Sequence, residues 1–374
     1  MAKGVNVNAN FYLPTRVVSG KGCVKASAAL MAKYGKRALI MTGRKSAKKS
    51  GAGSDMEAAL ASQGIESRLF DQVDSNPGIA DCRAAAGMAR EFGADFIVGI
   101  GGGSPLDAAK ATALLARNDL ADADVFKGSY PGGALPVIAV PTTAGTGSEV
   151  TQYAILTNDS IESKSSISWE GIFPALAFLD SAYTAALPHR VAVNTALDAL
   201  SHALEGYLAV RSDPWSRALA YEALLVFGKA LPRLADGYYG EELRSDLLFA
   251  ANMSGGVIAQ TATTIVHAMG YSLTYFKDID HGRANGLLLG PYLEFSEETN
   301  PQGAREVLDA LLCRNIEAFQ HLLDSLLGER ESISPDEIRK FTAIALKTKH
   351  VSNTARSLGE AEIKSLYAKG LRAL

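Results

Sequence analysis

The sequence predicts an α/β domain with a doubly wound, Rossmann-like parallel sheet, followed by an all-α domain. In the first half of the chain, short apolar runs alternate with helical stretches, which is the βαβ rhythm of an open sheet. In the second half, apolar residues recur every three or four positions and no convincing strand interrupts them. A chain of 374 residues is long enough for two domains. We expect the first over residues 1–184 and the second over residues 185–374.

The elements of each half follow from these patterns. Predicted strands are short apolar runs, and the run FIVGI is unbroken, as expected of a strand buried on both faces. Strands are predicted at residues 37–42, 66–70, 96–100 and 136–140, and helices between them at 54–63, 80–92 and 105–115. In the second half, helices are predicted at residues 191–209, 214–231, 243–260, 336–346 and 360–371.

Composition narrows the class of partner. The formal net charge of -3 gives no reason to expect nucleic acid or an anionic membrane surface as a partner. No apolar run reaches the roughly 18–20 residues that cross a bilayer, and the first residues lack the apolar segment of a secretory signal. The three cysteines are far apart and predict neither a disulfide framework nor a thiolate metal site. We therefore expect a cytoplasmic protein.

A run of three glycines, Gly101, Gly102 and Gly103, joins an apolar strand to a helix. Ser104 is a natural N-cap for that helix. Glycines let the backbone approach a pyrophosphate, and a helix N-terminus directs N–H donors towards it. The run matches neither G-x-G-x-x-G nor a Walker A loop. We interpret it as a phosphate-binding turn; the alternative is a tight strand–helix turn without a ligand.

A second loop follows the predicted strand at residues 136–140. It offers the hydroxyls of Thr142, Thr143, Thr146 and Ser148, and by itself it is a weak signal. Ligands of open α/β sheets bind outside the carboxyl ends of the strands. Two glycine- and hydroxyl-rich loops at such ends therefore favour one shared ligand.

One carboxylate and three imidazoles form a candidate metal site. Asp198 and His202 stand four residues apart on one predicted helix, so they share a face. His267 lies on a later helical segment, and we expect His281 in a loop at residues 280–282. Such a donor set suits Fe²⁺ or Zn²⁺. Spacing alone leaves open that each histidine is an ordinary core or solvated residue.

Several motifs in order resemble the iron-containing (group III) alcohol dehydrogenases, whose fold is shared with dehydroquinate synthase. They are GGGSPLDAAK, PTTAGTGSEVT, DALSHALEGY, VHAMGYSLT and DHGRANGLLL. The likeness is greatest to the NADP-preferring 1,3-propanediol/butanol dehydrogenase-like branch. It implies a small-molecule substrate and a metal-dependent, reversible hydride transfer between NAD(P)(H) and a short-chain primary alcohol or diol and its aldehyde. It also implies a homodimer, with Fe²⁺, or alternatively Zn²⁺, as the metal.

The resemblance also implies roles for individual residues. The metal ligands would be Asp198, His202, His267 and His281. Residues that would contact the cofactor lie after the predicted strands and in both loops: Gly43, Arg44, Ser46, Asn76, Gly101, Gly102, Gly103, Ser104, Asp107, Thr142, Thr143, Thr146, Ser148 and Lys164.

Two departures from the family pattern bear on function. Many members carry a second histidine four residues after the third ligand, where this chain has Tyr271, so we expect this tyrosine to offer a hydroxyl in the catalytic site. NAD-preferring members usually place an aspartate after the second strand. Here Gly43, Arg44, Lys45 and Ser46 stand there, and two cations in place of a carboxylate favour a 2′-phosphate. We therefore expect NADP(H) preference; the alternative is that both cations are solvated loop residues.

Three other functions remain open. A dehydroquinate-synthase-like lyase would need several cations to bind a polyanionic acid, and only Lys277 and Arg283 lie near the metal motifs. A glycerol-dehydrogenase-like polyol enzyme would use fewer histidines at its metal. A non-enzymatic paralogue that binds nucleotide and forms oligomers would not need all four ligands and both loops.

Overall fold

A computed structural model describes residues 9–158, 163–356 and 358–374 of the chain. The chain forms two compact units. We name the first, Pro14–Ala192 with Tyr239–Asn252, the sheet unit. The second, Val193–Tyr238 with Met253–Leu374 and the described residues before Pro14, is the helical unit. The predicted division after residue 184 stays a prediction.

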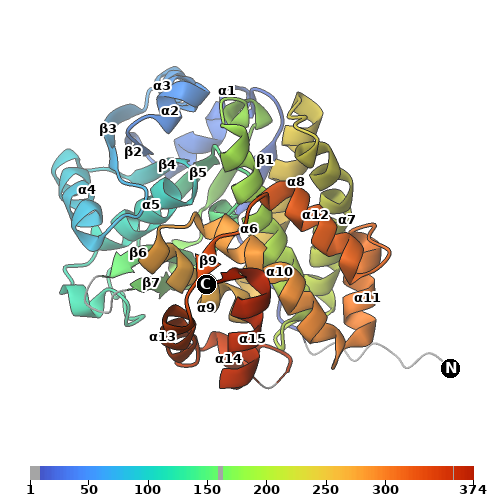
Figure 1. Cartoon of the computed structure of the whole chain (residues 1–374). Helices are drawn as coiled ribbons and strands as arrows, with labels where there is room; N and C mark the ends of the chain where they lie inside the picture. Colours follow the sequence, from blue (N-terminus) through green and yellow to red (C-terminus); the bar gives the residue numbers. More distant parts are fainter. Residues whose placement is uncertain (1–8, 159–162, 357) are drawn as a thin grey trace. The chain divides into compact units, whose positions relative to one another are not determined.

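The sheet unit is built on six parallel strands (Figure 1). Their order across the sheet is β1 (Arg16–Ser19), β8 (Leu176–Leu179), β5 (Val137–Pro141), β4 (Phe96–Gly101), β2 (Arg37–Gly43) and β3 (Glu66–Val73). The predicted parallel sheet is therefore confirmed, and the four predicted strands are β2, β3, β4 and β5. Strands β1 and β8 were not predicted, because four-residue strands carry too little pattern to separate them from loops.

Alternate residues of each strand face opposite layers of helices. On β2, Leu39 and Met41 pack in one cluster with α4 (Ile79–Phe92) and α5 (Gly103–Leu115). Ala38 and Ile40, on the other face, pack with α1 (Cys23–Ala26) and α3 (Ala52–Ser62). Each large apolar side chain buried in this way contributes about 1.5–3 kcal/mol. This two-sided burial holds the carboxyl ends of the strands, and the loops that follow them, in place.

The sheet unit contains further elements that the sequence did not predict. Strands β6 (Tyr153–Asn158) and β7 (Ser163–Ser168) form an antiparallel pair, and the shorter pieces are α2 (Ser46–Ser50), η1 (Ala28–Tyr34), η2 (Asp122–Asp124), η3 (Ser148–Val150), η5 (Glu170–Ile172) and η6 (Ser181–Thr184). The serine-rich β7 lacks the alternation of apolar and polar residues on which strand prediction depends.

From residue 189 onwards the chain is mainly helical, as predicted (Figure 1). The helices are α6 (His189–Leu208), α7 (Pro214–Ala235), α8 (Glu241–Thr261), α9 (Ile265–Lys277), α10 (His281–Glu297), α11 (Pro301–Ala310), α12 (Ile316–Leu327), α13 (Pro335–Ala345), α14 (His350–Asn353) and α15 (Glu360–Gly370). The prediction of a strand-free second half was wrong in one detail, because β9 (Ser332–Ile333) pairs in parallel with β10 (Arg372–Ala373). Among the described residues, no helix combines the length and apolar composition needed to span a membrane.

Local sequence explains where these helices begin. At α13, Ser334 accepts a hydrogen bond from the Glu337 N–H, and the Glu337 carboxylate accepts one from Ser334 N–H, with Pro335 at the first helical position. Asp213 caps α7 in the same way before Pro214. Such caps are worth about 1 kcal/mol each.

Candidate metal centre and glycine loops

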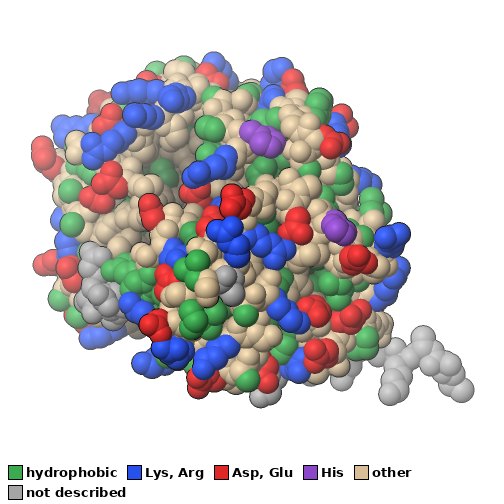
Figure 2. Space-filling model, in the orientation of Figure 1, with side chains coloured by type: hydrophobic (Ala, Val, Ile, Leu, Met, Phe, Trp, Pro, Cys, Tyr) green, Lys and Arg blue, Asp and Glu red, His purple; other side chains and the backbone are tan. Residues whose placement is uncertain are grey.

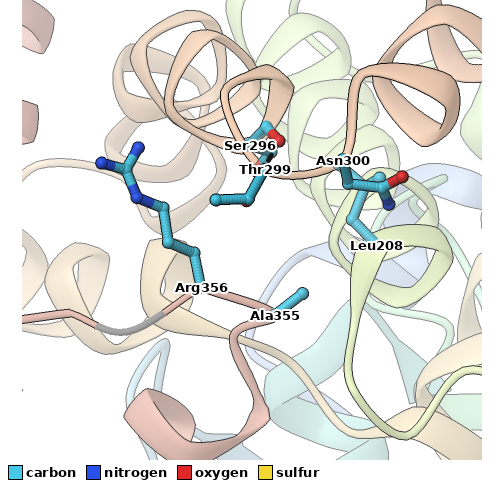
Figure 3. A pocket seen from close by; sticks show the side chains of 6 residues that line it. All are labelled: Leu208, Ser296, Thr299, Asn300, Ala355 and Arg356. Atoms are coloured by element: carbon cyan, nitrogen blue, oxygen red, sulfur yellow. Dashed lines mark hydrogen bonds between the residues drawn. The ribbon is translucent and has the colours of Figure 1, made fainter.

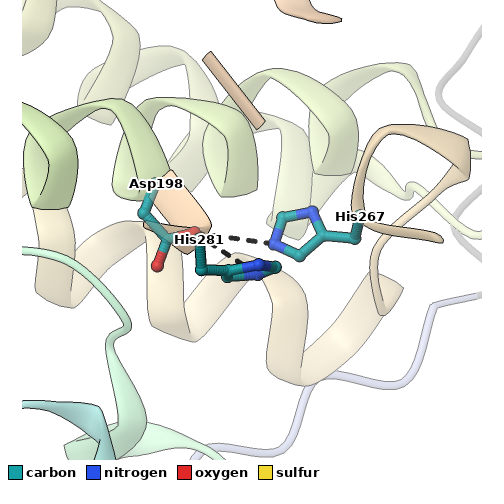
Figure 4. Close-up of side chains that lie close together, drawn as sticks. All are labelled: Asp198, His267 and His281. Atoms are coloured by element: carbon teal, nitrogen blue, oxygen red, sulfur yellow. Dashed lines mark ion pairs between the residues drawn. The ribbon is translucent and has the colours of Figure 1, made fainter. Parts of the chain in front are cut away.

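Three helices of the helical unit bring the four predicted ligands together. Asp198 and His202 lie one turn apart on α6, His267 is near the start of α9, and His281 is the first residue of α10. The Nε2 atoms of His267 and His281 each lie 3.8 Å from Asp198 Oδ1, and that of His202 lies 4.0 Å from it. Figure 4 shows the side chains of Asp198, His267 and His281 converging. The predicted loop position of His281 was wrong, since the helix already begins at this residue.

The arrangement fits a divalent metal ion. One donor atom each from Asp198, His267 and His281 lies within 4.8 Å of the others, and the His202 ring stacks on His267 with ring centroids 4.7 Å apart. Asp198, His202 and His267 are all buried. Nitrogen and oxygen donors of this kind suit Zn²⁺ or Fe²⁺.

Two glycines make this convergence possible. A Cβ at Gly282 would lie 1.8 Å from the Asn194 carbonyl oxygen, so α10 can approach α6 only without a side chain there. A Cβ at Gly270 would lie 2.1 Å from Asn285 Oδ1. Gly270 therefore leaves room for the Asn285 amide, whose Nδ2 lies 3.1 Å from Asp198 Oδ1 and within 3.3 Å of both His267 Nε2 and His281 Nε2.

The electrostatics of the cluster favour a cation. Burial opposes ionisation of Asp198, but the neighbouring imidazoles and the Asn285 amide hold the pKa of its carboxyl below its ordinary value. Burial would likewise lower the pKa of His267, but the carboxylates of Glu205 and Asp198 raise it instead. Both directions fit a buried site in which ionised carboxylates lie beside imidazoles.

Aromatic and polar side chains surround the ligands. The Tyr271 ring, on α9, stacks on His281 with centroids 5.1 Å apart and planes 8° apart. Thr274 Oγ1 lies 3.4 Å from His281 Nδ1. The structure thus places Tyr271 beside a predicted ligand, while its catalytic role stays a prediction.

Sequence reasoning missed two polar residues of this cluster, Glu205 and Asn285. The Glu205 carboxylate contacts His267 Nδ1 and is fully buried. A positional signal existed for both, because Glu205 follows His202 by three residues and Asn285 follows His281 by four. Each therefore lies on the ligand-bearing face of its helix.

The glycine turn lies in the sheet unit, where β4 runs into α5. Gly101 has a φ of +151°, and Gly102 is the N-cap residue of α5, with no side-chain hydrogen bond at that end. Ser104 was predicted as the N-cap, and that was wrong: it lies inside the helix and donates to the Ser75 carbonyl at 2.5 Å. The bare N-terminus of α5 therefore keeps its N–H groups available for an anion.

The second loop packs directly against the glycine turn. In the sheet register Gly101 pairs with Pro141, so both loops leave neighbouring strands at their carboxyl ends. A Cβ at Gly102 would meet the Thr143 side chain at 3.2 Å, and one at Gly103 would meet Thr146 at 2.6 Å. A side chain at Gly103 would therefore force Thr146 to move, and one at Gly102 would crowd Thr143; with glycine at both positions the two loops form a close backbone cradle that fits a pyrophosphate.

A buried ion pair connects the two loops. Asp107 Oδ1 accepts a hydrogen bond from Ser148 Oγ at 2.5 Å, and Oδ2 accepts one from Ile155 N–H at 3.0 Å. Lys110, fully buried, lies 3.1 Å from Asp107 Oδ1 and donates to the Ser148 carbonyl at 3.0 Å. Burial lowers the pKa of Lys110, an effect that Asp107 opposes.

The other predicted cofactor residues of the sheet unit follow strands β2 and β3 or lie on β7. Arg44 follows β2 and forms an exposed pair with Asp74, at 3.3 Å between Nε and Oδ1. Ser46 begins α2, and the Asn76 carbonyl accepts from Thr157 Oγ1 at 3.0 Å. Lys164 lies on β7, opposite Thr157. Thr142 is hydrogen-bonded to the glycine turn, because its N–H donates to the Gly101 carbonyl at 2.8 Å.

The mixed charge of the surface and a small pocket are two other features of the structure. Lys and Arg are interspersed with Asp and Glu over the face drawn in Figure 2, in keeping with a net charge of -3. Figure 3 shows a small pocket lined by Leu208, Ser296, Thr299, Asn300, Ala355 and Arg356. None of these six is a predicted site residue, and Arg356 already pairs with Glu298 at 2.5 Å.

Comparison with known proteins covers nearly the whole chain. The family described as iron-containing alcohol dehydrogenase matches residues 14–181, and the C-terminal domain of the Fe-containing alcohol dehydrogenase family matches residues 192–371. The chain is 34% identical over 289 residues to the probable alcohol dehydrogenase EutG of Escherichia coli (strain K12), covering 76% of this chain and 73% of that protein. It is 29% identical over 323 residues to the NADPH-dependent butanol dehydrogenase of Clostridium saccharobutylicum, covering 85% and 81%.

A solved structure shares the fold. The crystal structure of an iron-containing alcohol dehydrogenase from Thermotoga maritima has 37% identity and a TM-score of 0.90, over 97% of this chain and 99% of that one.

Proposed function

Because this chain belongs to the iron-containing alcohol dehydrogenase family and is a metal-dependent oxidoreductase, we propose that it interconverts a short-chain primary alcohol or diol with its aldehyde. The observation that carries the proposal is the convergence of Asp198, His202, His267 and His281 from three helices. We assign these four residues as ligands of one divalent ion, Fe²⁺ or Zn²⁺.

The chemistry is divided between the bound groups and the protein. A divalent ion supplies Lewis acidity towards an alcohol oxygen, and a nicotinamide ring accepts or gives hydride. Asp198 and the histidines would hold such an ion in a buried site, where electrostatic interactions are screened less than in water. Tyr271, stacked on His281, covers one side of the ligand set, and we assign its hydroxyl to the catalytic site.

We assign the dinucleotide to the two loops of the sheet unit. Gly101, Gly102, Gly103 and Ser104 would hold the pyrophosphate at the start of α5. Asp107 would keep the loops in register through Ser148. The other contacts would come from Gly43, Arg44, Ser46, Asn76, Thr142, Thr143, Thr146, Ser148 and Lys164. We favour NADP(H), since Arg44 and Lys45 follow β2, where NAD-preferring family members usually place an aspartate, and a relative is named as NADPH-dependent.

Location and assembly complete the proposal. The three cysteines are free and buried, which fits a reducing compartment, and we propose the cytoplasm. We propose a homodimer because the family that the chain resembles is commonly dimeric. Light scattering of the purified protein would give the mass directly, and a monomer would contradict this part.

Replacement of His281 by Ala tests the metal-dependent activity. We expect the variant to lose bound metal and to fall about 100-fold or more in kcat/KM, because one ligand is removed from a buried site. Metal content after anaerobic purification and absorbance at 340 nm with short alcohols and aldehydes measure both effects. His321→Ala removes an exposed histidine on α12 and should change neither. Full activity of the metal-free wild-type protein would overturn the assignment.

Replacement of Arg44 by Ala tests the cofactor preference. We expect KM for NADP(H) to rise about tenfold, since one charge-assisted contact to the 2′-phosphate is lost, while KM for NAD(H) stays unchanged. Arg68→Ala, which removes another exposed arginine paired with a carboxylate, is the matched control. An equal change for both cofactors would show that Arg44 does not read the 2′-phosphate.

A further inference from the structure

The buried carboxylate of Glu205 has no assigned role in the site described above. We propose that Glu205 is a positioning residue that fixes the tautomer and orientation of His267, so that His267 Nε2 presents its lone pair to the metal ion. The proposal rests on the assignment of His267 as a metal ligand.

Placement on α6 brings Glu205 behind the ligand set. It follows Asp198 by seven residues and His202 by three, and thus lies on the same face of the helix. Its Oε2 contacts His267 Nδ1, on the side of the imidazole away from Asp198. His267 Nε2, on the other side of the ring, lies 3.8 Å from Asp198 Oδ1. The imidazole therefore lies between the two carboxylates.

The chemistry of the pair determines which nitrogen carries the proton. An ionised carboxylate only accepts hydrogen bonds, whereas a neutral imidazole has one N–H and one lone pair. Because Nδ1 faces Glu205, the proton belongs on Nδ1 and the lone pair on Nε2. A metal-ligating histidine needs this arrangement, and a carboxylate behind it also increases the basicity of the ligand.

Neighbouring donors keep the Glu205 carboxylate in place. Its Oε1 accepts hydrogen bonds from Thr264 N–H at 2.9 Å and from Thr264 Oγ1 at 2.6 Å. Thr264 immediately precedes α9, the helix that carries His267. The same carboxylate thus binds the residue that precedes α9 and the histidine on that helix. It therefore fixes both the start of α9 and the His267 ring. All of these groups are buried.

Replacement of Glu205 by Gln is the experiment. Glutamine keeps the size of the side chain, but presents an N–H₂ group that would make Nδ1 an acceptor and move the proton to Nε2. We expect the dissociation constant for Zn²⁺, measured on the full-length protein by competition with a chelator, to rise about 10–100-fold. Glu306→Gln is the matched control: Glu306 accepts from Tyr207 Oη at 2.5 Å and should keep wild-type affinity.

A spectroscopic readout separates positioning from general loss of structure. Long-range ¹H–¹⁵N spectra of the zinc-loaded wild-type protein should show His267 protonated at Nδ1, and the Glu205→Gln spectrum should lack this pattern. Wild-type affinity and pattern in Glu205→Gln would overturn the proposal. Failure of the wild-type protein to bind Zn²⁺ would instead overturn the metal site itself, and the proposal with it.

A second variant keeps the test open if Glu205→Gln does not fold. Thr264→Val removes one donor to the carboxylate and conserves the shape of the side chain. We expect its dissociation constant for Zn²⁺ to rise by about threefold to tenfold, the size of one lost hydrogen bond. An unchanged constant would count against Glu205 as the group that holds His267.

Discussion

The glycine loops and the metal cluster both depend on buried charge, but they balance it in different ways. In the sheet unit, Lys110 lies against Asp107 and also donates to backbone carbonyls, so cation and anion meet within the protein. In the helical unit, the carboxylates Asp198 and Glu205 contact imidazoles, an amide and a threonine. An imidazole is neutral or charged according to its surroundings.

The ion pair of the loop region holds the two loops together, whereas the carboxylates of the metal cluster can bind a cation. In the loop region Lys110 lies against Asp107, and the backbone at the start of α5 forms a cradle that fits an anion. The cluster keeps two buried carboxylates whose balance improves when a divalent cation arrives. Changes to Lys110, His350 and Gly282 probe this contrast in order of decreasing effect.

Replacement of Lys110 by Met should leave Asp107 without the cation that neutralises its charge. We expect the free energy of unfolding to fall by about 3–5 kcal/mol, because Asp107 would remain buried without its cation. Urea unfolding measures the change. Lys369→Met removes an exposed lysine paired with Glu294, and the loss there should stay below about 1 kcal/mol. A loss of similar size in both variants would mean that the loops do not depend on this pair.

The helical unit should be the more acid-sensitive of the two, and His350 on α14 supplies one reason. Its Nδ1 is buried without a hydrogen-bond partner among the described residues, and burial lowers the pKa of His350 from 6.5 to about 4. Between these values the unfolded chain binds the proton and the folded chain does not, so stability falls as pH falls. Each tenfold change in proton affinity is worth about 1.4 kcal/mol, which gives a loss of about 3 kcal/mol by pH 4.

The variant His350→Gln cannot take up this proton, so it measures how much of the stability lost at low pH comes from His350. Subtraction of its unfolding free energy from that of the wild-type protein at each pH cancels the other titrating groups. The difference should change by about 3 kcal/mol between pH 7 and pH 4. A difference independent of pH would show that His350 does not cause the acid sensitivity.

Replacement of Gly282 by Ala should damage the metal cluster through packing alone. The added methyl group would meet the Asn194 carbonyl, and we expect α10 to shift at a cost of about 1–3 kcal/mol, with weaker metal binding. Gly87→Ala, in α4, adds the same methyl group where nothing lies within 4 Å, and should stabilise the protein by up to about 1 kcal/mol. Thermal unfolding and chelator competition measure both variants; unchanged metal affinity in Gly282→Ala would contradict the packing argument.

Much of the fold follows from local patterns in the sequence, whereas the site depends on distance in space. The apolar runs predicted the central strands because a strand buried on both faces leaves a strong signal. The four-residue strands β1 and β8 and the serine-rich β7 leave almost none. The helix start was misplaced at Ser104 because a side-chain cap is the usual sign of a helix N-terminus, and here glycine serves instead.

The candidate site illustrates the same limit. Spacing related Asp198 only to His202, and the resemblance to a family was needed to join His267 and His281 to them. Glu205 and Asn285 escaped because a polar residue on a helix is usually solvated, and only the packing of α6, α9 and α10 buries these two. Gly270 and Gly282 permit that packing, but a glycine in a sequence does not show which neighbour it allows to come close.

The ligands come from α6, α9 and α10, so an ion bound by all of them would act as a removable cross-link within the fold. With free metal at about 100 times its dissociation constant, the folded state gains about 2.7 kcal/mol. Transient opening of the helices, which exposes the chain to proteases, would then be about 100-fold rarer in the loaded protein. The metal-loaded protein would thereby be cut by proteases more slowly than the metal-free protein.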